Sequence, residues 1–269
     1  MLLLFAQAAF AGTFFKLDEN VIDERLHQAA AKNPEREAAL KNLFSQAGCK
    51  DLSEEHVPRR LPNVVCVLPG ETRRTIIVGA HFDKVEAGQG VVDNWSGASL
   101  LPSLYQSLAS APRRHTFIFV GFTSEEVGLI GSKYYAQHMT SEERAQTDAM
   151  VNMDSLGLTP TKIWVSHSDP VLVSDLVAVA RQFNLPVEGV NVEEVGSTDS
   201  ESFAQKKIPH ITIHSVTQDT LPILHSARDD FKAINAKDYY DSYRLIAAYL
   251  AYLDLNLAKK TQQSTTGSH

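Results

Sequence analysis

Short apolar runs in this sequence lead, one after another, into histidine and acidic residues. The clearest run is 75–78, TIIV, which is apolar and β-branched and therefore typical of a buried strand. It is followed by His81 and Asp83 and, after a loop with two glycines, by Asp93. The same order recurs twice: 115–122 precedes Glu125 and Glu126, and 149–153 precedes Asp154.

Helical segments separate these runs, for example at 97–110 and 172–183. Alternating strands and helices predict a sheet with helices on both faces. The strand at 63–68 ends in Pro69–Gly70, a turn signal, so we expect it to form a hairpin with the strand at 75–80. The predicted fold is a single α/β domain with a mixed, mostly parallel central sheet.

No break in composition divides the 269 residues. We expect the domain to span 18–258, with a last helix at 236–257 and a polar tail at 259–269. Residues 1–17 are expected to hold a signal-peptide remnant and an N-terminal arm, since MLLLFAQAAFAG is Leu-rich and ends in an A-x-A pattern. This predicts a secreted or periplasmic protein. If the stretch is instead an arm packed on the domain, the protein is cytoplasmic.

Charge and hydropathy argue against two classes of partner. The formal net charge is −7 and no basic run is present, so nucleic acid is not an expected partner. No apolar stretch approaches the length of a membrane-spanning helix.

Cys49 and Cys66 are too few for a thiolate metal site. They would pair in an exported protein or stay as buried thiols in the cytosol.

The polar residues after the strands are expected to meet at one edge of the sheet, where α/β proteins bind ligands. The set is His81, Asp83, Asp93, Glu125, Glu126, Asp154, Asp199 and His225. So many carboxylates at one rim repel each other unless cations neutralise them. Oxygen and imidazole ligands without thiolate favour zinc or cobalt. The pattern therefore predicts a metal centre.

Five motifs carry a family resemblance. They are His81-Phe82-Asp83, Asp93-Asn94-Trp95-Ser96-Gly97, the run 124–132 (SEEVGLIGS), Asn152-Met153-Asp154 and His225-Ser226-Ala227-Arg228-Asp229. In this order they resemble the co-catalytic, two-zinc aminopeptidases, such as the secreted bacterial leucyl-type enzymes, and more distantly the glutaminyl cyclases. The resemblance extends from about residue 63 to 234.

The resemblance implies two zinc ions per chain and a role for each matching residue. The implied zinc ligands are His81 and Asp154 for one ion, Glu126 and His225 for the other, and Asp93 as the bridge. Glu125 would be the general base for a zinc-activated water, and Asp83 would orient His81. Asp199 and Phe203 lie where the family has substrate contacts, although Ser200 replaces a histidine usual there.

The implied function is a metallo-exopeptidase that removes N-terminal residues from peptides. A glutaminyl-peptide cyclotransferase with one zinc is the first alternative, because it shares most of the ligands. A carboxypeptidase on the same scaffold is the second, since these motifs do not encode the direction of peptide binding. A non-catalytic ectodomain ranks last, because such relatives lose metal ligands that this sequence retains.

Overall fold

Eight strands form one sheet in a computed structural model that describes residues 13–192 and 196–266. The order across the sheet is β1-β2-β4-β3-β5-β8-β6-β7. The strands are β1 (Asp51–Glu55), β2 (Asn63–Leu68), β3 (Thr75–His81), β4 (Thr116–Phe122), β5 (Thr147–Met153), β6 (Lys162–Ile163), β7 (Glu188–Gly189) and β8 (His210–His214). The sheet is mixed: β4, β3, β5 and β8 run parallel, and β1 and β2 are antiparallel to their neighbours.

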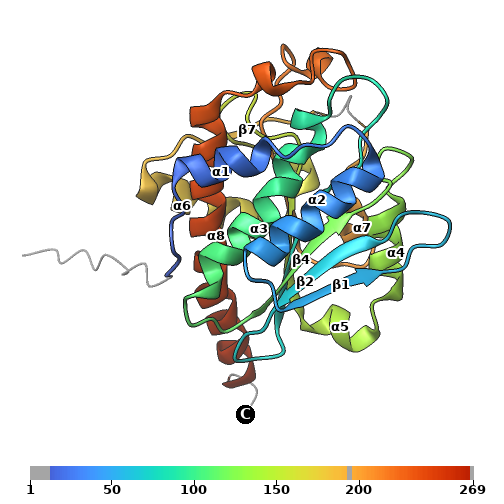
Figure 1. Cartoon of the computed structure of the whole chain (residues 1–269). Helices are drawn as coiled ribbons and strands as arrows, with labels where there is room; N and C mark the ends of the chain where they lie inside the picture. The colour runs from blue at the N-terminus through green and yellow to red at the C-terminus, as the bar shows by residue number, and fades with distance from the viewer. Residues whose placement is uncertain (1–12, 193–195, 267–269) are drawn as a thin grey trace, which may run out of the picture.

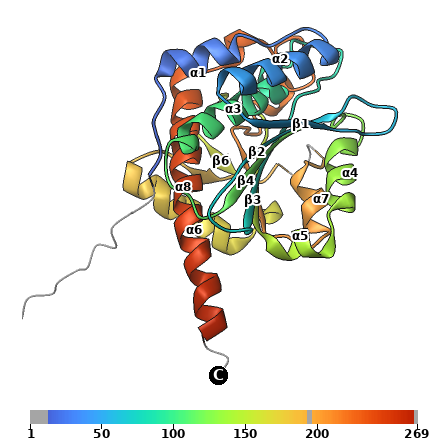
Figure 2. The same ribbon diagram turned by 60° about the horizontal axis from the view of Figure 1, so that its bottom comes forward.

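Helices cover both faces of the sheet (Figures 1 and 2). The α-helices are α1 (Glu19–Leu26), α2 (Asn33–Gln46), α3 (Ser96–Ala109), α4 (Ile130–His138), α5 (Ser141–Gln146), α6 (Pro170–Phe183), α7 (Ser200–Ala204) and α8 (Ala236–Thr266). Figure 2 shows α4, α5 and α7 on one side of the strands and α1, α2, α3 and α8 on the other. The predicted α/β fold with a mixed sheet is confirmed.

The central strand β3 explains why its sequence is apolar without interruption. Successive side chains of a strand point to opposite faces. Ile76 and Val78 pack in the core that contains α3 and α8, whereas Ile77 packs in the second core on the other face. All three are fully buried, so both faces of β3 contribute to the stability of the sheet.

The expected hairpin between β2 and β3 is wrong. β2 pairs antiparallel with β4, which lies between β2 and β3. The Pro69–Gly70 turn instead passes the start of β4, where Thr72 N donates to Arg114 O at 2.9 Å. After β3 the chain passes through α3 and returns as β4, which pairs in parallel with β3 as in a βαβ unit and so occupies the edge that a hairpin with β2 would need. The edge strand β1, DLSEE, was not predicted, since its sequence lacks apolar alternation.

The two ends of the described chain differ in how they pack. Residues 13–17 of the expected arm lie against α3 and α8: Phe15 N donates to Ser107 O, and Leu17 N donates to Tyr243 Oη, both at 2.8 Å. The signal-like stretch 1–12 lies outside the described residues. At the other end α8 continues to Thr266, beyond the expected end near 257, and its last turns project from the fold (Figure 2).

A disulfide joins Cys49, after α2, to Cys66 in β2, with a Cα–Cα distance of 6.4 Å. The pairing that the sequence left open is therefore present. Among the described residues, no helix combines the length and apolar character needed to cross a membrane.

Replacing both cysteines with alanine is expected to lower the free energy of unfolding by about 3 kcal/mol, because the disulfide closes a loop of 17 residues in the unfolded chain. Urea unfolding with and without reductant measures this effect. Reductant should destabilise the wild type but leave the double variant unchanged. A wild-type midpoint that does not respond to full reduction would contradict the prediction.

Candidate metal centre

Three parallel strands bring their carboxyl ends to the same edge of the sheet. β3 ends at His81, which pairs with Phe122 at the end of β4. β4 leads into the turn with Glu125 and Glu126, and β5 leads directly into Asp154. The strand order β4-β3-β5 therefore places these side chains next to one another, as the sequence predicted.

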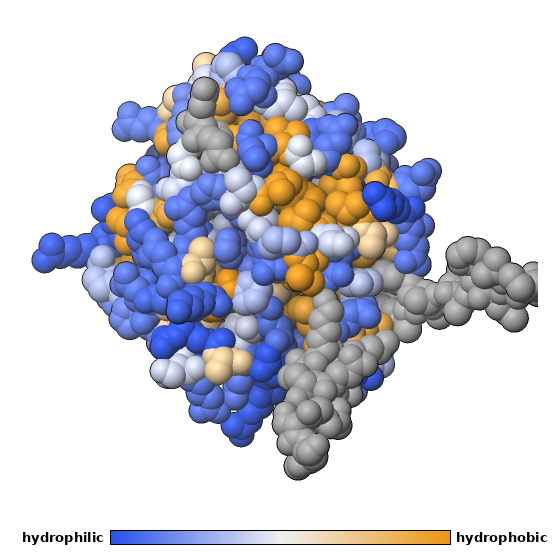
Figure 3. Space-filling model, turned by 180° about the vertical axis from the view of Figure 1, so that it is seen from behind, coloured by the Kyte–Doolittle hydropathy of each residue, from blue (hydrophilic) through white to orange (hydrophobic). Residues whose placement is uncertain are grey.

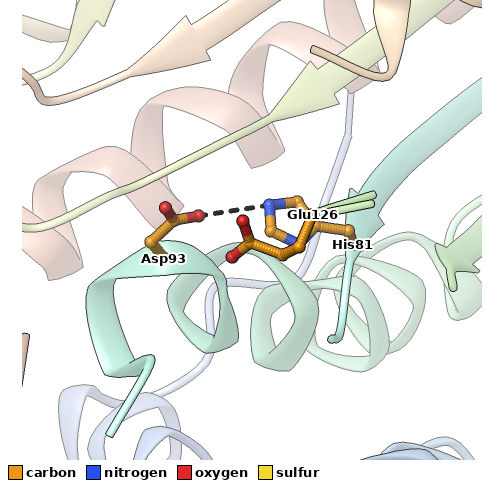
Figure 4. Close-up of side chains that lie close together, drawn as sticks. All are labelled: His81, Asp93 and Glu126. Atoms are coloured by element: carbon orange, nitrogen blue, oxygen red, sulfur yellow. Dashed lines mark ion pairs between the residues drawn. The ribbon is translucent and has the colours of Figure 1, made fainter. Parts of the chain in front are cut away.

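Asp93 lies between two histidines. It comes from the segment Val91–Trp95 that precedes α3, and the peptide bond after it is cis. Its Oδ1 is 3.2 Å from Nε2 of His81, and its Oδ2 is 3.2 Å from Nε2 of His225. Figure 4 shows the Asp93 carboxylate pointing toward His81, with Glu126 beside them. One carboxylate thus faces two imidazoles with its two separate oxygens.

The remaining acidic side chains of the site divide between the two histidines. Asp154 Oδ1 is 3.6 Å from Nε2 of His81, and Glu125 Oε2 is 4.0 Å from the same nitrogen. Glu126 Oε2 is 2.8 Å from Nε2 of His225. The arrangement therefore has two halves, one around His81 and one around His225, and Asp93 belongs to both.

Asp83 does more than the resemblance implied. Its Oδ1 is 3.6 Å from His81 Nδ1, a nitrogen whose closer partner is the backbone oxygen of Asp83 at 3.2 Å. The same carboxylate accepts hydrogen bonds from the backbone N–H groups of Glu125 (3.0 Å) and Glu126 (3.3 Å). Asp83 therefore holds the turn that carries both glutamates, a contact that no sequence signal indicated.

Thr198 and Asp229 form hydrogen bonds that hold two of the candidate metal ligands, Asp154 and Asp93, in position. Thr198 Oγ1 donates to Asp154 Oδ2 at 2.8 Å and accepts from Asn152 Nδ2 at 2.7 Å. The Asp229 carboxylate accepts from the backbone N–H groups of Val92 (2.7 Å) and Asp93 (3.2 Å). Hydrogen bonds of this kind orient metal ligands.

The protonation of the site reflects its crowded acids. Burial, together with the charges of Asp199 and Asp154, raises the pKa of Glu125 to about 10, against the lowering effect of His81. Hydrogen bonds to Asp93 and Glu126 raise the pKa of His225 to about 10. Burial opposes ionisation of Asp93, but both histidines hold its pKa below the usual range. Cations would relieve the repulsion among the carboxylates that contributes to the raised pKa of Glu125.

The residues present fit zinc. Two groups of side chains bring one ligand atom each to within 4.8 Å of one another: His81, Asp93 and Glu126, and His81, Glu125 and Asp154. Glu126 Oε1 is buried and, among the described residues, has no hydrogen-bond partner. Imidazole nitrogens and carboxylate oxygens are the ligands of catalytic zinc sites. The unpaired oxygen is thus available for a cation.

The candidate metal ligands line a cavity of about 290 Å³. Besides His81, Asp93, Glu125, Glu126, Asp154 and His225, apolar side chains form part of its wall: Trp164, Val192, Val216 and Leu224. A buried His214 also lines it, and burial lowers the pKa of that residue to about 4, so it is neutral. Figure 3 shows the back of the molecule, where apolar patches interrupt a mainly hydrophilic surface. The sequence did not indicate the apolar residues of the cavity wall, because they come from separate loops.

The two expected substrate contacts do not line the cavity. Phe203 is fully buried and its ring lies 5.9 Å from Phe122 and 6.0 Å from Tyr135, measured between centroids. Asp199 is 1% exposed, and burial raises its pKa to about 7. Phe203 therefore belongs to the core, and Asp199 is a buried carboxylate away from the cavity wall.

Residues 63–250 match the model of peptidase family M28. Similar curated proteins are leupeptin-inactivating enzyme 1 of Streptomyces exfoliatus, 28% identical over 151 residues, and aminopeptidase YwaD of Bacillus subtilis, 25% identical over 183 residues. The alignments cover 55% and 64% of this chain and 34% and 40% of the relatives. The chain thus spans about a third to two fifths of the length of these relatives.

Solved structures share the fold. The LapA aminopeptidase of Legionella pneumophila superposes with a TM-score of 0.77 at 21% identity, covering 88% of this chain and 72% of that one. BSAP, a zinc aminopeptidase from Bacillus subtilis, gives 0.65 at 21% identity over 71% and 49%. A glutaminyl cyclase from an Acidobacteriales bacterium gives 0.69 at 18% identity over 88% and 94%.

Proposed function

Because the chain belongs to peptidase family M28, we propose that it is a zinc-dependent aminopeptidase that releases N-terminal residues from peptides. Membership confirms the family resemblance that the five motifs indicated. Its relatives include aminopeptidases, which supports the proposed reaction class.

The position of the Asp93 carboxylate is the strongest support for this proposal. Asp93 directs one oxygen to His81 and the other to His225, each at 3.2 Å. A carboxylate shared in this way is what a two-metal site needs to hold both ions at a separation of about 3.5–4 Å. We therefore assign His81, Asp93 and Asp154 to one zinc and Asp93, Glu126 and His225 to the other.

Zinc ions bound by these residues would lower the pKa of a water molecule and polarise the scissile carbonyl. Glu125, on the cavity wall, would accept the proton of the attacking water and return it to the leaving amine. Asp83 would keep Glu125 in place through its backbone N–H. The apolar wall at Trp164, Val216 and Leu224 would exclude water and receive the side chain of the N-terminal residue.

A glutaminyl-peptide cyclotransferase with one zinc remains the alternative, because a glutaminyl cyclase shares the fold. His81 and Asp154 favour the two-zinc hydrolase, since a single ion held by Glu126 and His225 would leave both of them without a metal. A carboxypeptidase would use the same ligands with the peptide reversed.

The proposed location is outside the cytoplasm. The Leu-rich start with its A-x-A pattern and the Cys49–Cys66 disulfide support export together, because disulfides persist in oxidising compartments. Mass spectrometry of material from the native host should find a chain that begins near Gly12 and contains no reduced cysteine. A chain with intact Met1 and two reduced thiols would contradict export.

Hydrolysis of a panel of aminoacyl-4-nitroanilides tests the reaction. We expect release of nitroaniline that stops with a chelator and returns with zinc. A blocked N-acyl analogue serves as the control and should not react. Ring closure of a glutaminyl peptide without nitroanilide hydrolysis would favour the cyclase, and loss of residues from the C-terminus of a peptide would favour the carboxypeptidase.

A further inference from the structure

A fully buried arginine, Arg36, lies close to the candidate metal ligands, on helix α2, which contributes no ligand itself. Arg36 is in the first half of α2 and is 0% exposed. Its Cζ lies 5.2 Å from the centre of the Trp95 ring. In sequence Arg36 stands between Glu35 and Glu37, a pattern typical of the exposed face of a helix. Its burial could therefore not be predicted from the sequence.

Three of the four hydrogen bonds that Arg36 donates go to backbone carbonyls of the loop between the candidate metal ligands His81 and Asp93, and the fourth goes from Nη1 to Ala30 O at 3.3 Å. Nε donates to Phe82 O at 2.5 Å, directly after His81. Nη2 donates to Gly90 O at 2.7 Å, and Nη1 donates to Gln89 O at 3.2 Å, shortly before Asp93. One guanidinium therefore joins the start and the end of the 82–90 loop.

The 82–90 loop contains no helix or strand, and its Gly88 and Gly90 have positive φ angles of 66° and 62°. A second clamp also comes from α2, where the Asn33 side chain exchanges two hydrogen bonds with the backbone of Lys84, at 3.1 and 3.3 Å.

The same loop contacts the segment that carries His225. Gln89 N donates to Asp229 O at 2.7 Å. A Cβ on Gly88 would lie 2.3 Å from Ser226 O, so the two backbones are in close approach. The position of the 82–90 loop is thus linked to both halves of the site.

Nearby carboxylates compensate the positive charge of the buried Arg36. Burial lowers its pKa to about 10, opposed by the charges of Asp83, Asp229, Asp93 and Glu126, so it is protonated at neutral pH. A buried cation costs free energy unless nearby charges and hydrogen bonds compensate. Here the acids of the metal centre supply the charge, and the loop carbonyls supply the hydrogen bonds.

We propose that Arg36 is a positioning residue of the metal centre: its planar guanidinium fixes the 82–90 loop, and through it the separation of His81, Asp93 and the His225 segment. The inference rests on the zinc site of the proposed function and names a residue that sets its metal affinity. Arginine is needed because a lysine ammonium cannot reach three carbonyls in fixed directions.

Zinc affinity, measured by competition with a chromogenic chelator, tests this positioning role. Arg36→Met should raise the zinc dissociation constant at least ~10-fold, the low end of the effect of losing a group that orients a metal ligand. Arg25→Met is the matched control, because Arg25 is also buried but donates to Ser103 and Gln106 rather than to the loop. It should leave zinc affinity unchanged even where it lowers thermal stability.

Two milder variants keep the test decisive if Arg36→Met does not fold. Arg36→Lys keeps the charge and should share the loss of zinc affinity. Asn33→Ala removes the second clamp and should show a smaller loss. The absorption spectrum of the cobalt-substituted protein should change in the Arg36 variants and not in Arg25→Met.

Wild-type zinc affinity in Arg36→Met, or its full recovery in Arg36→Lys, would overturn the inference. The second result would show that charge alone suffices. Failure of the proposed function is distinguishable, because it would appear as a wild-type protein that binds zinc without hydrolysing peptides, with the affinity differences among the variants intact.

Discussion

Replacing Glu125 with glutamine is expected to lower kcat by ~10²–10⁴, the range typical of losing a general base. Glutamine keeps the size and hydrogen-bonding ability of the side chain but cannot accept a proton. Glu125 is half-buried at the cavity, with its Oε2 4.0 Å from His81 Nε2, in surroundings that raise its pKa to about 10. The charge of nearby zinc would favour the ionised form that a base requires.

Zinc content separates this explanation from a loss of metal. Since Glu125 is not assigned as a ligand, Glu125→Gln should retain zinc at the wild-type level and should unfold at a similar temperature. Steady-state kinetics with metal analysis of the same sample provides the measurement. A variant with wild-type kcat would remove Glu125 from the mechanism.

Glu126→Gln should behave in the opposite way. Glu126 Oε2 lies 2.8 Å from His225 Nε2, and its other oxygen is buried without a hydrogen-bond partner among the described residues. An amide is a much weaker ligand for zinc than a carboxylate. We expect the affinity of one zinc to fall by more than the ~10–100-fold that loss of a supporting group costs.

Activity of Glu126→Gln should therefore be low in stoichiometric zinc and partly restored by excess zinc. Titration of activity against added zinc, beside the Glu125 variant as the matched control, measures this. The assignments of the two residues would have to be exchanged if Glu126→Gln were fully metallated but inactive and Glu125→Gln were metal-poor but rescued.

Much of the candidate site could be predicted because it depends on strand ends. His81, Glu125 and Asp154 follow apolar runs, and parallel strands bring such residues to one edge whatever their order in the sheet. His225 was included in the same set, but it lies in a loop without a periodic pattern, and only the family resemblance gave it the role of a zinc ligand. The structure brings it to 3.2 Å from Asp93.

The parts that were missed depend on long-range contacts. β4 lies between β2 and β3 because the chain returns through α3 to pair in parallel with β3, and a local turn signal such as Pro69–Gly70 does not contain that information. Phe203 was expected near substrate, but its ring fills the core beside Phe122. Arg36 has hydrogen-bond partners more than forty residues away in sequence.

Titration of the metal-depleted protein with zinc tests the central claim most directly. Native mass spectrometry would count the ions bound while nitroanilide hydrolysis is followed in the same samples. The account predicts an inactive apoprotein, activity that rises with zinc, and a plateau at two ions per chain. Full activity in the protein without metal, or a plateau of activity reached with fewer than two ions per chain, would contradict it.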